Sequence, residues 1–259
     1  MKHKIYPSAS AFMWGDVVLT DYDSGCLRSI LIKSHTPRTE IPKLYQEVGA
    51  VHETKYEGEV KDHLLFREQP IKAEILTDVE YSGRCDFILD YGLPIVDECK
   101  ATVSQSGVRG LREGKYKLSH LAQLVSYLCK LKIPRGRLIY GYYERTAHDW
   151  VEVERYVFKV SIADSGAVFI NGVDSGFHVN DQLRHLFQVA KHLKEQKIGP
   201  RPWGWESKWG SPCNLCPFQA TCASYDNGEI ESLDEVVASA TQELKTHTPF
   251  QPKIKWRKS

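Results

Sequence analysis

The chain has 259 residues, of which 42% are hydrophobic and 26% charged, and its formal net charge at pH 7 is +1. This length allows one large domain or two small ones, and the composition is ordinary for a globular protein. A charge so close to zero excludes a protein that coats nucleic acid through a general positive excess, so any contact with DNA must come from local patches. No apolar run is long enough to span a bilayer and no secretory signal follows Met1, which predicts a cytoplasmic protein without membrane contact.

Hydrophobic periodicity and turn residues predict a series of interleaved strands and helices. In chain order the predicted elements are a helix within 9–35, a mostly helical stretch over 42–67, a strand over 71–79, a turn at 81–83, strands over 84–90 and 94–100, a helix over 116–131, strands over 137–144 and 151–162, and an amphipathic helix over 179–197. The strands on either side of Gly92 are expected to form a hairpin. The alternation indicates a mixed α/β core.

A carboxylate–lysine pattern occupies the predicted hairpin. Side chains alternate faces along a strand, so Glu98 and Lys100 point to one side and Cys99 to the other. Asp86, on the first strand, lies across from that end of the second. Two carboxylates and an amine suit phosphodiester hydrolysis, because carboxylates hold Mg²⁺ or Mn²⁺ and the amine stabilises the charged transition state. The same residue types are also common on solvated surfaces, so the pattern alone leaves both interpretations open.

Two helical positions join this pattern. Gln123 and Tyr127 are four residues apart on the predicted helix over 116–131, so they project from the same side. His52 lies upstream on another helix, where a lone histidine is more often structural than a ligand.

The order of these motifs resembles that of RecB-type nucleases, a branch of the PD-(D/E)xK superfamily, over about residues 45–145. It runs Gly49-x-x-His52, Gly83-Arg84-Cys85-Asp86, Asp97-Glu98-Cys99-Lys100, Gln123-x-x-x-Tyr127. The resemblance implies a restriction-endonuclease-like core, in which helices flank a mixed central sheet. It implies metal ligands at His52, Asp86, Glu98 and the carbonyl of Cys99, catalysis by Lys100, and support from Gln123 and Tyr127.

One residue departs from the family pattern. Asp97 precedes Glu98, where the family usually has an apolar residue. A second acid near the site or exposure at a sheet edge would explain it, and we expect the exposed edge.

The seven cysteines are unevenly spread, and in a cytoplasmic chain a disulfide framework is not expected. Cys213, Cys216 and Cys222 form a C-x₂-C-x₅-C group, and a closed four-thiolate site needs one more ligand. Cys26, in a polar stretch, is the best fourth ligand, whereas Cys85, Cys99 and Cys129 have the apolar neighbours of core cysteines. From the residues alone, three alternatives remain open for the four thiolates: a [4Fe–4S] cluster, zinc, or no metal at all.

An N-terminal cysteine, a RecB-type core and a C-x₂-C-x₅-C group together resemble the iron–sulfur RecB nucleases over residues 20–222. These nucleases include the fourth family of CRISPR-associated proteins, phage-borne relatives and the AddB nuclease domain. The resemblance implies a [4Fe–4S] cluster that joins the N- and C-terminal segments. It also implies an exonuclease on single-stranded DNA ends, with 5′ to 3′ polarity, in CRISPR spacer processing or phage DNA metabolism.

This interpretation divides the chain into four parts. They are an N-terminal segment with one cluster cysteine over 1–40, the nuclease core over 41–198, a cluster-binding segment over 199–225, and a polar, partly flexible tail over 226–259.

Basic residues ahead of the helix over 116–131 are candidate contacts for DNA phosphates. They are Arg109, Arg112, Lys115 and Lys117. Any one of them could equally be an ordinary surface residue.

Two alternative functions remain open. The chain could be a non-catalytic DNA-end-binding subunit that recruits an integrase or helicase, or a structure-specific endonuclease. The complete set of Asp86, Glu98 and Lys100 favours an enzyme, because a binding module does not need all three.

Overall fold

The computed structural model describes residues 3–5, 27–36, 43–198, 216 and 218–246. The chain divides into two compact units. Unit 1 comprises residues 1–40, 73–82 and 184–250, and unit 2 comprises 41–72, 83–183 and 251–259. The four-part division expected from the sequence stays a prediction.

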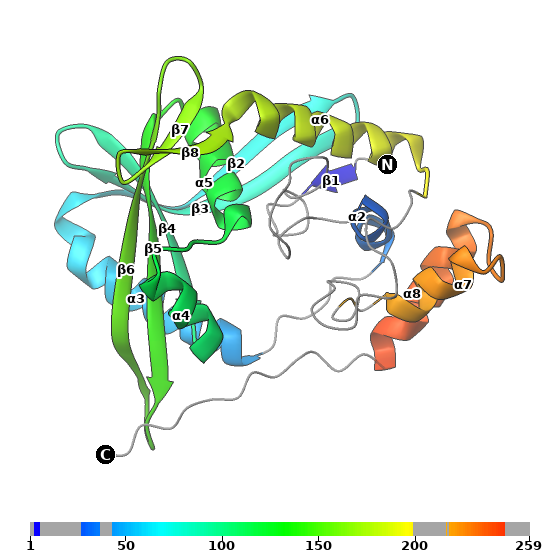
Figure 1. The fold of residues 1–259 in the computed structure, drawn as a ribbon, viewed down its shortest axis with the longest axis horizontal. Coiled ribbons are helices and arrows are strands. Elements are labelled where there is room, and N and C mark those ends of the chain that lie inside the picture. The colour runs from blue at the N-terminus through cyan, green and yellow to red at the C-terminus, as the bar shows by residue number, and fades with distance from the viewer. Residues whose placement is uncertain (1–2, 6–26, 37–42, 199–215, 217, 247–259) are drawn as a thin grey trace. The chain divides into compact units, whose positions relative to one another are not determined.

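Unit 2 is built on a mixed sheet. Its strands are β2 (Leu64–Leu76) and β3 (Val79–Asp90), which both continue into unit 1, and β4 (Pro94–Thr102), β5 (Arg135–Arg145), β6 (Trp150–Ile162), β7 (Ala167–Ile170) and β8 (Val173–His178). The strands pair in the order β3-β4-β5-β6-β7-β8, with β2 also paired to β3. The pairing of β4 with β5 is parallel, whereas the others from β3 to β8 are antiparallel. Helices flank this sheet, so the expected mixed α/β core is confirmed (Figure 1).

Helix α3 (Lys43–Val60) covers one face of the sheet, and a short 3₁₀ turn, η1 (Lys61–His63), follows it. Tyr56 and Val60 of this helix pack with Cys99 of β4 and Ile139 of β5 in one apolar cluster. Aliphatic burial of this kind is worth about 1.5–3 kcal/mol for each large side chain. It fixes α3 on the side to which Cys99 points.

Helix α5 (Leu118–Leu131) covers the opposite face of β4 and β5. A Cβ added to Gly136 would lie 3.1 Å from the side chains of Leu124 and Leu128 and 2.6 Å from the carbonyl oxygen of Val96. Gly136 is three residues from Ile139, and an odd separation on a strand means opposite faces. The glycine therefore lets α5 approach the sheet closely on the face away from α3. Helix α4 (Gln105–Arg112) precedes α5.

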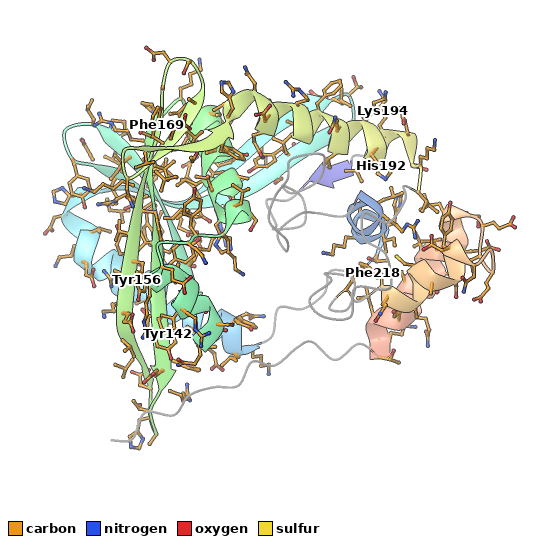
Figure 2. All side chains as sticks on the ribbon, in the orientation of Figure 1. Tyr142, Tyr156, Phe169, His192, Lys194 and Phe218 are labelled. Carbon is orange, nitrogen blue, oxygen red and sulfur yellow. The ribbon has the colours of Figure 1, made fainter. Side chains whose placement is uncertain are left out.

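Unit 1 contains part of the N-terminal region and the C-terminal helices. Its elements are β1 (His3–Ile5), α2 (Leu27–His35), the rest of α6 (Val179–Glu195), which begins in unit 2, α7 (Gln219–Asp226) and α8 (Leu233–Thr246). β1 pairs in parallel with Val79–Tyr81. Ile32 of α2 packs with Phe218 and with Val236 of α8, and Figure 2 shows Phe218 beside the C-terminal helices. None of the helices in the described residues is long and apolar enough to cross a membrane.

Several predicted elements are confirmed and others are wrong. The hairpin around Gly92, the helix α5, and the strands β5 and β6 agree with the prediction. The helix predicted over 42–67 ends at Val60, because the β-prone run Leu64-Leu65-Phe66 begins β2. The turn predicted at 81–83 lies inside β3, and the chain reverses instead at Asp78, which has a φ of 69°.

Helix α4 and the β7–β8 hairpin are among the elements that were not predicted. α4 has only eight residues, too few for a clear helical period. The β7–β8 hairpin turns at Asn171 and Gly172, with φ values of 52° and 83°. An Asn-Gly turn between short strands is a recognised hairpin signal, so this element could have been found.

Candidate active site

The hairpin of β3 and β4 carries Asp86 to the candidate site. Its register pairs Phe87 with Asp97 and Asp90 with Pro94. The backbone N–H of Cys99 donates a hydrogen bond to Oδ2 of Asp86, with a distance of 2.7 Å. Asp86 therefore lies against the segment of β4 that contains Glu98 and Lys100.

Glu98 and Lys100 point to the face covered by α5. Because Cys99 is packed against α3, its two neighbours on the strand point the other way. Nζ of Lys100 donates to Oε1 of Glu98 at 2.5 Å. The other oxygen, Oε2, is buried and has no hydrogen-bond partner. Glu98 thus presents an unsatisfied carboxylate oxygen inside the protein.

These charges influence one another strongly. Burial and then the negative charge of Asp86 raise the pKa of Glu98 to about 8. Burial likewise raises the pKa of Asp86, although Lys100 and the Cys99 N–H oppose it. Burial lowers the pKa of Lys100, but the two carboxylates outweigh that effect and leave it raised. One amine does not compensate two buried carboxylates, so the site favours a further cation.

Gln123 and Tyr127 project from the same side of helix α5, as their spacing predicted. Nε2 of Gln123 donates to the hydroxyl of Tyr127 at 3.0 Å. Burial and then the charge of Glu98 raise the pKa of Tyr127, so its hydroxyl is within electrostatic range of that carboxylate. Both side chains are therefore close to the Asp86–Glu98–Lys100 group, and their supporting roles stay predictions.

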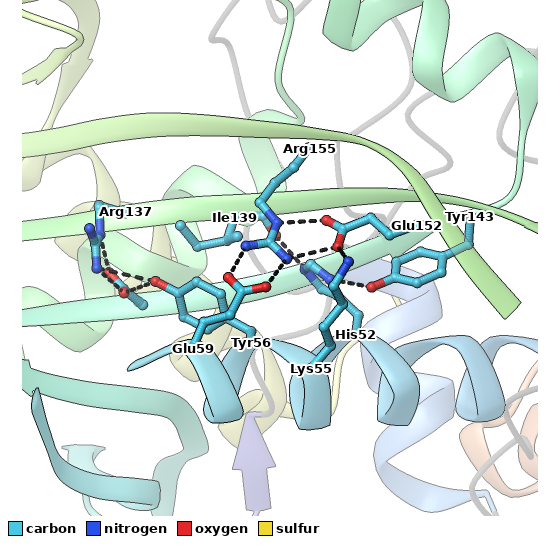
Figure 3. A network of polar contacts seen from close by, with 10 residues as sticks. His52, Lys55, Tyr56, Glu59, Arg137, Ile139, Tyr143, Glu152 and Arg155 are labelled. Atoms are coloured by element: carbon cyan, nitrogen blue, oxygen red, sulfur yellow. Dashed lines mark hydrogen bonds and ion pairs between the residues drawn. The ribbon is translucent and has the colours of Figure 1, made fainter. Parts of the chain in front are cut away.

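His52 occupies a different position. Its Nε2 lies 3.1 Å from the carbonyl oxygen of Ile139, which can only accept, so Nε2 carries the proton. Its Nδ1 lies 3.0 Å from the hydroxyl of Tyr143 and accepts from it (Figure 3). Gly141 leaves room for the ring, since a Cβ there would lie 2.6 Å from Nδ1. In this arrangement both nitrogens are engaged on the α3 side of the sheet, so the structure does not bring His52 to Glu98. Its role as a metal ligand stays a prediction.

The next residue on α3, Glu53, was not singled out from the sequence. Burial raises its pKa, and the largest electrostatic contribution comes from Asp86, with Lys100 acting in the opposite direction. Glu53 is therefore a third carboxylate near the candidate site. In the sequence, the only indication that Glu53 belongs to the site is its position next to His52 of the motif.

His120 was also missed. The sheet register places Tyr140 directly beside Lys100. The ring of His120 stacks on that of Tyr140, and its Nδ1 lies 2.9 Å from the tyrosine hydroxyl. Burial lowers the pKa of His120 well below its usual value, and the charge of Lys100 lowers it further. A neutral imidazole thus lies near Lys100. The sequence signal that could have identified His120 is its position one helical turn before Gln123.

Asp97 corrects the expectation of an exposed edge. β4 lies between β3 and β5, and Asp97 is fully buried. Its carboxylate accepts two hydrogen bonds from Arg137, at 2.8 and 2.6 Å, and a third from the hydroxyl of Tyr56 at 2.5 Å. It points toward α3, away from Glu98. Asp97 is therefore part of an ion pair in the interior, and this pair allows an acid in a central strand.

The predicted phosphate contacts differ in their availability. Arg112 forms an ion pair with Glu154, and Lys115 forms one with Glu113 at 2.7 Å. Arg109 and Lys117 have no ion pair among the described residues. Contact of any of these four with DNA stays a prediction.

The cysteines of the predicted cluster are only partly described. Cys26 and Cys213 lie outside the described residues. Cys216 and Cys222 belong to one apolar cluster of unit 1. Arg28 of α2 contacts the Cys222 thiol and pairs with Asp226 at 2.9 Å. Within the part of the chain that the structure describes, no group of three or more His, Cys, Asp or Glu side chains is arranged to hold a metal ion.

The fold resembles that of a solved exonuclease. The alkaline exonuclease of Laribacter hongkongensis is 11% identical and has a TM-score of 0.50, with 74% of this chain and 89% of that one covered. A phage-related exonuclease from Haemophilus somnus is 12% identical, with a TM-score of 0.47 and coverage of 76% and 95%. The protein SSO0001 is 16% identical, with a TM-score of 0.45 and coverage of 86% and 87%. No protein-family model and no curated protein matches the chain.

Proposed function

We propose that the protein is a metal-dependent DNA exonuclease that acts on single-stranded ends. The observation that carries this proposal is the convergence of Asp86, Glu98 and Lys100 on one face of β3 and β4. The likeness of the fold to that of an alkaline exonuclease supports it. The 5′ to 3′ polarity and a role in CRISPR spacer processing or phage DNA metabolism rest on the resemblance of the motif series.

The residues present fit a divalent cation. Oε2 of Glu98 is buried without a partner, and a hard oxygen of this kind is the ligand that Mg²⁺ or Mn²⁺ prefers. Asp86 and Glu98 would hold the cation, which supplies charge neutralisation and an activated water when bound. Glu53, Cys99 through its carbonyl, and His52 after a change of its ring contacts are further candidate ligands.

Lys100 and α5 complete the proposed chemistry. Lys100 holds Oε1 of Glu98, and its ammonium stabilises negative charge on the phosphate in the transition state. Tyr127, bonded to Gln123, closes the site beside Glu98 and limits the access of bulk water. His120 offers a neutral imidazole near Lys100 that can bond to a phosphate oxygen.

We also propose that Cys26, Cys213, Cys216 and Cys222 hold a [4Fe–4S] cluster. Support comes from Arg28, two residues after Cys26, because it contacts Cys222 and Asp226. Helix α2 is thus close to Cys222 within unit 1.

A digestion panel tests the proposed activity. Purified protein with Mn²⁺ or Mg²⁺ should degrade linear single-stranded DNA, and Lys100→Ala and Asp86→Ala should lower the rate by about 10³-fold or more. A Lys61→Ala variant, far in sequence from these residues, is the control. Undiminished cleavage by both site variants would exclude this site as the source of activity.

The other substrates in the panel separate the alternatives. Cleavage of circular single strands or branched duplexes would indicate an endonuclease. Binding of DNA ends without cleavage would indicate the non-catalytic subunit.

A further inference from the structure

A pocket lies on unit 2, apart from the candidate active site. It has a volume of about 530 Å³, and its walls come from the first residues of β5, the end of β6 and the β7–β8 turn. The lining residues are Ile95, Arg135, Gly136, Arg137, Lys159, Val160, Ser161, Asn171 and Gly172. Arg137 points toward α3, as its partner Asp97 does, whereas Glu98 and Lys100 point toward α5. The pocket therefore belongs to the other face of the sheet.

The register concentrates positive charge in this pocket. Arg137 lies directly opposite Lys159 on the neighbouring strand, and Arg135 lies opposite Ser161. Like charges that face each other across a strand pair destabilise a sheet. Asp97 neutralises Arg137 alone, and neither Arg135 nor Lys159 has an ion pair with any described residue. No carboxylate lines the pocket, so its walls retain two uncompensated cations.

One donor, the guanidinium of Arg137, and the turn at Asn171 are held in place before any ligand arrives. Asp97 accepts two hydrogen bonds from the guanidinium of Arg137 and so fixes its orientation. The Asn171 turn is joined to β6 by two bonds: its N–H donates to the carbonyl of Lys159 at 2.8 Å, and its Oδ1 accepts from the Lys159 N–H at 2.9 Å. A donor that is already oriented lowers the ordering cost of binding.

Size and chemistry together indicate the class of ligand. Arginine and lysine donors arranged in one concavity suit an anion with several oxygens, above all a phosphate. A volume of about 530 Å³ exceeds the needs of one inorganic ion and is within the range of pockets for small molecules. The apolar side chain of Ile95 can cover a sugar, and the exposed ring of Tyr91 lies 5.3 Å from the Arg137 guanidinium.

We propose that this pocket binds a backbone phosphate of the DNA strand, away from the point of cleavage. The proposal rests on the proposed exonuclease function, because that function makes a DNA strand the ligand. A phosphate held here would anchor the substrate on unit 2 while the carboxylate site acts on another part of the strand. Free mononucleotides share the same chemistry, and the experiment distinguishes the two sources.

The test compares the full-length chain with an Arg135→Ala/Lys159→Ala variant. A Lys61→Ala/Lys72→Ala variant is the matched control, since it removes the same charge from exposed side chains that do not line the pocket. Binding of a labelled single-stranded oligonucleotide is followed by fluorescence anisotropy in EDTA, over a range of salt concentrations. Melting temperatures confirm that the variants fold. The melting temperature of the pocket variant should equal or exceed that of the wild type, because the substitutions remove the contact between like charges.

The pocket variant should bind the oligonucleotide several-fold more weakly than the control. The slope of log K against log salt should be smaller by about 0.7, because one phosphate contact on a single strand contributes about 0.7. Equal affinities and slopes for the two variants would overturn the proposal. The proposal would also be overturned if the pocket variant lost affinity for dAMP or inorganic phosphate but kept its affinity for the oligonucleotide. A free nucleotide would then be the ligand.

Cleavage of a short dinucleotide by Mn²⁺-loaded protein separates this proposal from the proposed function. The pocket variant should keep the wild-type rate on that substrate, because a dinucleotide at the carboxylate site has no further phosphate to place in the pocket. Loss of this activity in the pocket variant alone would overturn the proposal of an anchoring role. A wild-type protein that binds oligonucleotides through the pocket but cleaves nothing would contradict the proposed function and leave the pocket proposal supported.

Discussion

Glu98 is a buried carboxylate whose charge is only partly compensated. Lys100 bonds to one of its oxygens, but the other is buried without a partner. An unsatisfied buried acceptor costs about 1–3 kcal/mol, and groups with strongly shifted pKa values concentrate at functional sites. The arrangement is therefore poor for stability and suited to binding a cation.

Replacement of Glu98 by glutamine should stabilise the metal-free protein at alkaline pH. The pKa of Glu98 is raised to about 8, so the folded state holds this proton more tightly than the unfolded state does. Stability is then lost as pH rises from about 4.5 toward 8. Glu98→Gln removes this loss and should raise the free energy of unfolding at pH 8 by about 1–3 kcal/mol.

Urea denaturation in EDTA at pH 5 and pH 8 measures this effect. Addition of Mn²⁺ should raise the melting temperature of the wild type but not that of Glu98→Gln, because ligand binding stabilises only a competent site. An equal Mn²⁺ response in the two proteins would contradict the assignment of Glu98 as a ligand.

The adjacent residues His52 and Glu53 provide a matched pair of variants. Glu53 is near Asp86, whereas His52 is bonded to Ile139 and Tyr143. Glu53→Gln should therefore weaken Mn²⁺-dependent cleavage about 10-fold or more with little change in stability. His52→Gln should mainly destabilise the fold, by about 1–3 kcal/mol.

The pH dependence of stability separates the two roles further. Burial lowers the pKa of His52 below 6.5, so as the pH falls the unfolded state binds a proton at this residue before the folded state does. The wild type should lose stability as pH falls below about 6.5, and His52→Gln should lack that component. A His52→Gln protein with normal stability and weakened Mn²⁺ affinity would instead show that His52 moves to bind the metal.

At the scale of elements, the sequence predicts the parts with a strong repeating pattern. The hairpin of β3 and β4 follows from β-branched residues around Gly92, and α5 follows from its leucine period. These two elements place Asp86, Glu98, Lys100 and Tyr127 together. The position of α3 could not be predicted, because it depends on which helix face packs against Ile139 and Tyr143. The helix face that packs against the sheet decides whether His52 or Glu53 approaches the site. The spacing of the motifs does not indicate which face this is.

A network of ion pairs joins α3 to β6 (Figure 3). Arg155 donates to Glu152 of the same strand at 2.6 and 2.7 Å and pairs with Glu59 of α3. Lys55 of α3 also pairs with Glu152 at 2.5 Å. The side chain of Glu152 is only 5% exposed, so loss of Arg155 leaves a nearly buried charge that is paired with Lys55 alone among the described residues.

Arg155→Met should therefore destabilise the protein by about 2 kcal/mol at pH 7, since it keeps the aliphatic stem but removes the charge. Arg155 lowers the pKa of Glu59 and, against the effect of burial, that of Glu152. Carboxylates with lowered pKa values stabilise the fold above about pH 4.5 and lose this contribution as pH falls through the folded-state values.

The difference between the wild type and Arg155→Met should accordingly shrink at pH 3. Urea denaturation at the two pH values measures it. Arg67→Met serves as the control, because Arg67 pairs with Glu57 at a more exposed position and its loss should cost less than about 1 kcal/mol. A difference that is constant with pH would mean that the ion pairs do not stabilise the contact of α3 with β6.

At the scale of the whole chain, the fold class could be predicted but the division into compact units could not. Interleaved strands and helices indicate a mixed sheet in the sequence, and the structure has one. However, the elements β2, β3 and α6 are each divided between the two units. Long-range packing of this kind leaves no local pattern, because hydrophobic periodicity reports on which face is buried and not on its partner.

The last prediction concerns the four thiolates that are proposed to bind a cluster, because they come from the N-terminal and C-terminal segments of the chain. Protein purified without oxygen should be brown, with broad absorbance near ~400 nm from thiolate-bound iron. Cys222→Ala should lose the iron and sulfide, and unit 1 should become less stable, because this residue contacts Arg28 and packs among α2, α7 and α8. Cys129→Ala is the matched control, since Cys129 lies on α5 of the other unit, and it should keep the colour. A colourless protein with one zinc ion would assign the thiolates to zinc, and retention of iron by Cys222→Ala would remove this cysteine from the site.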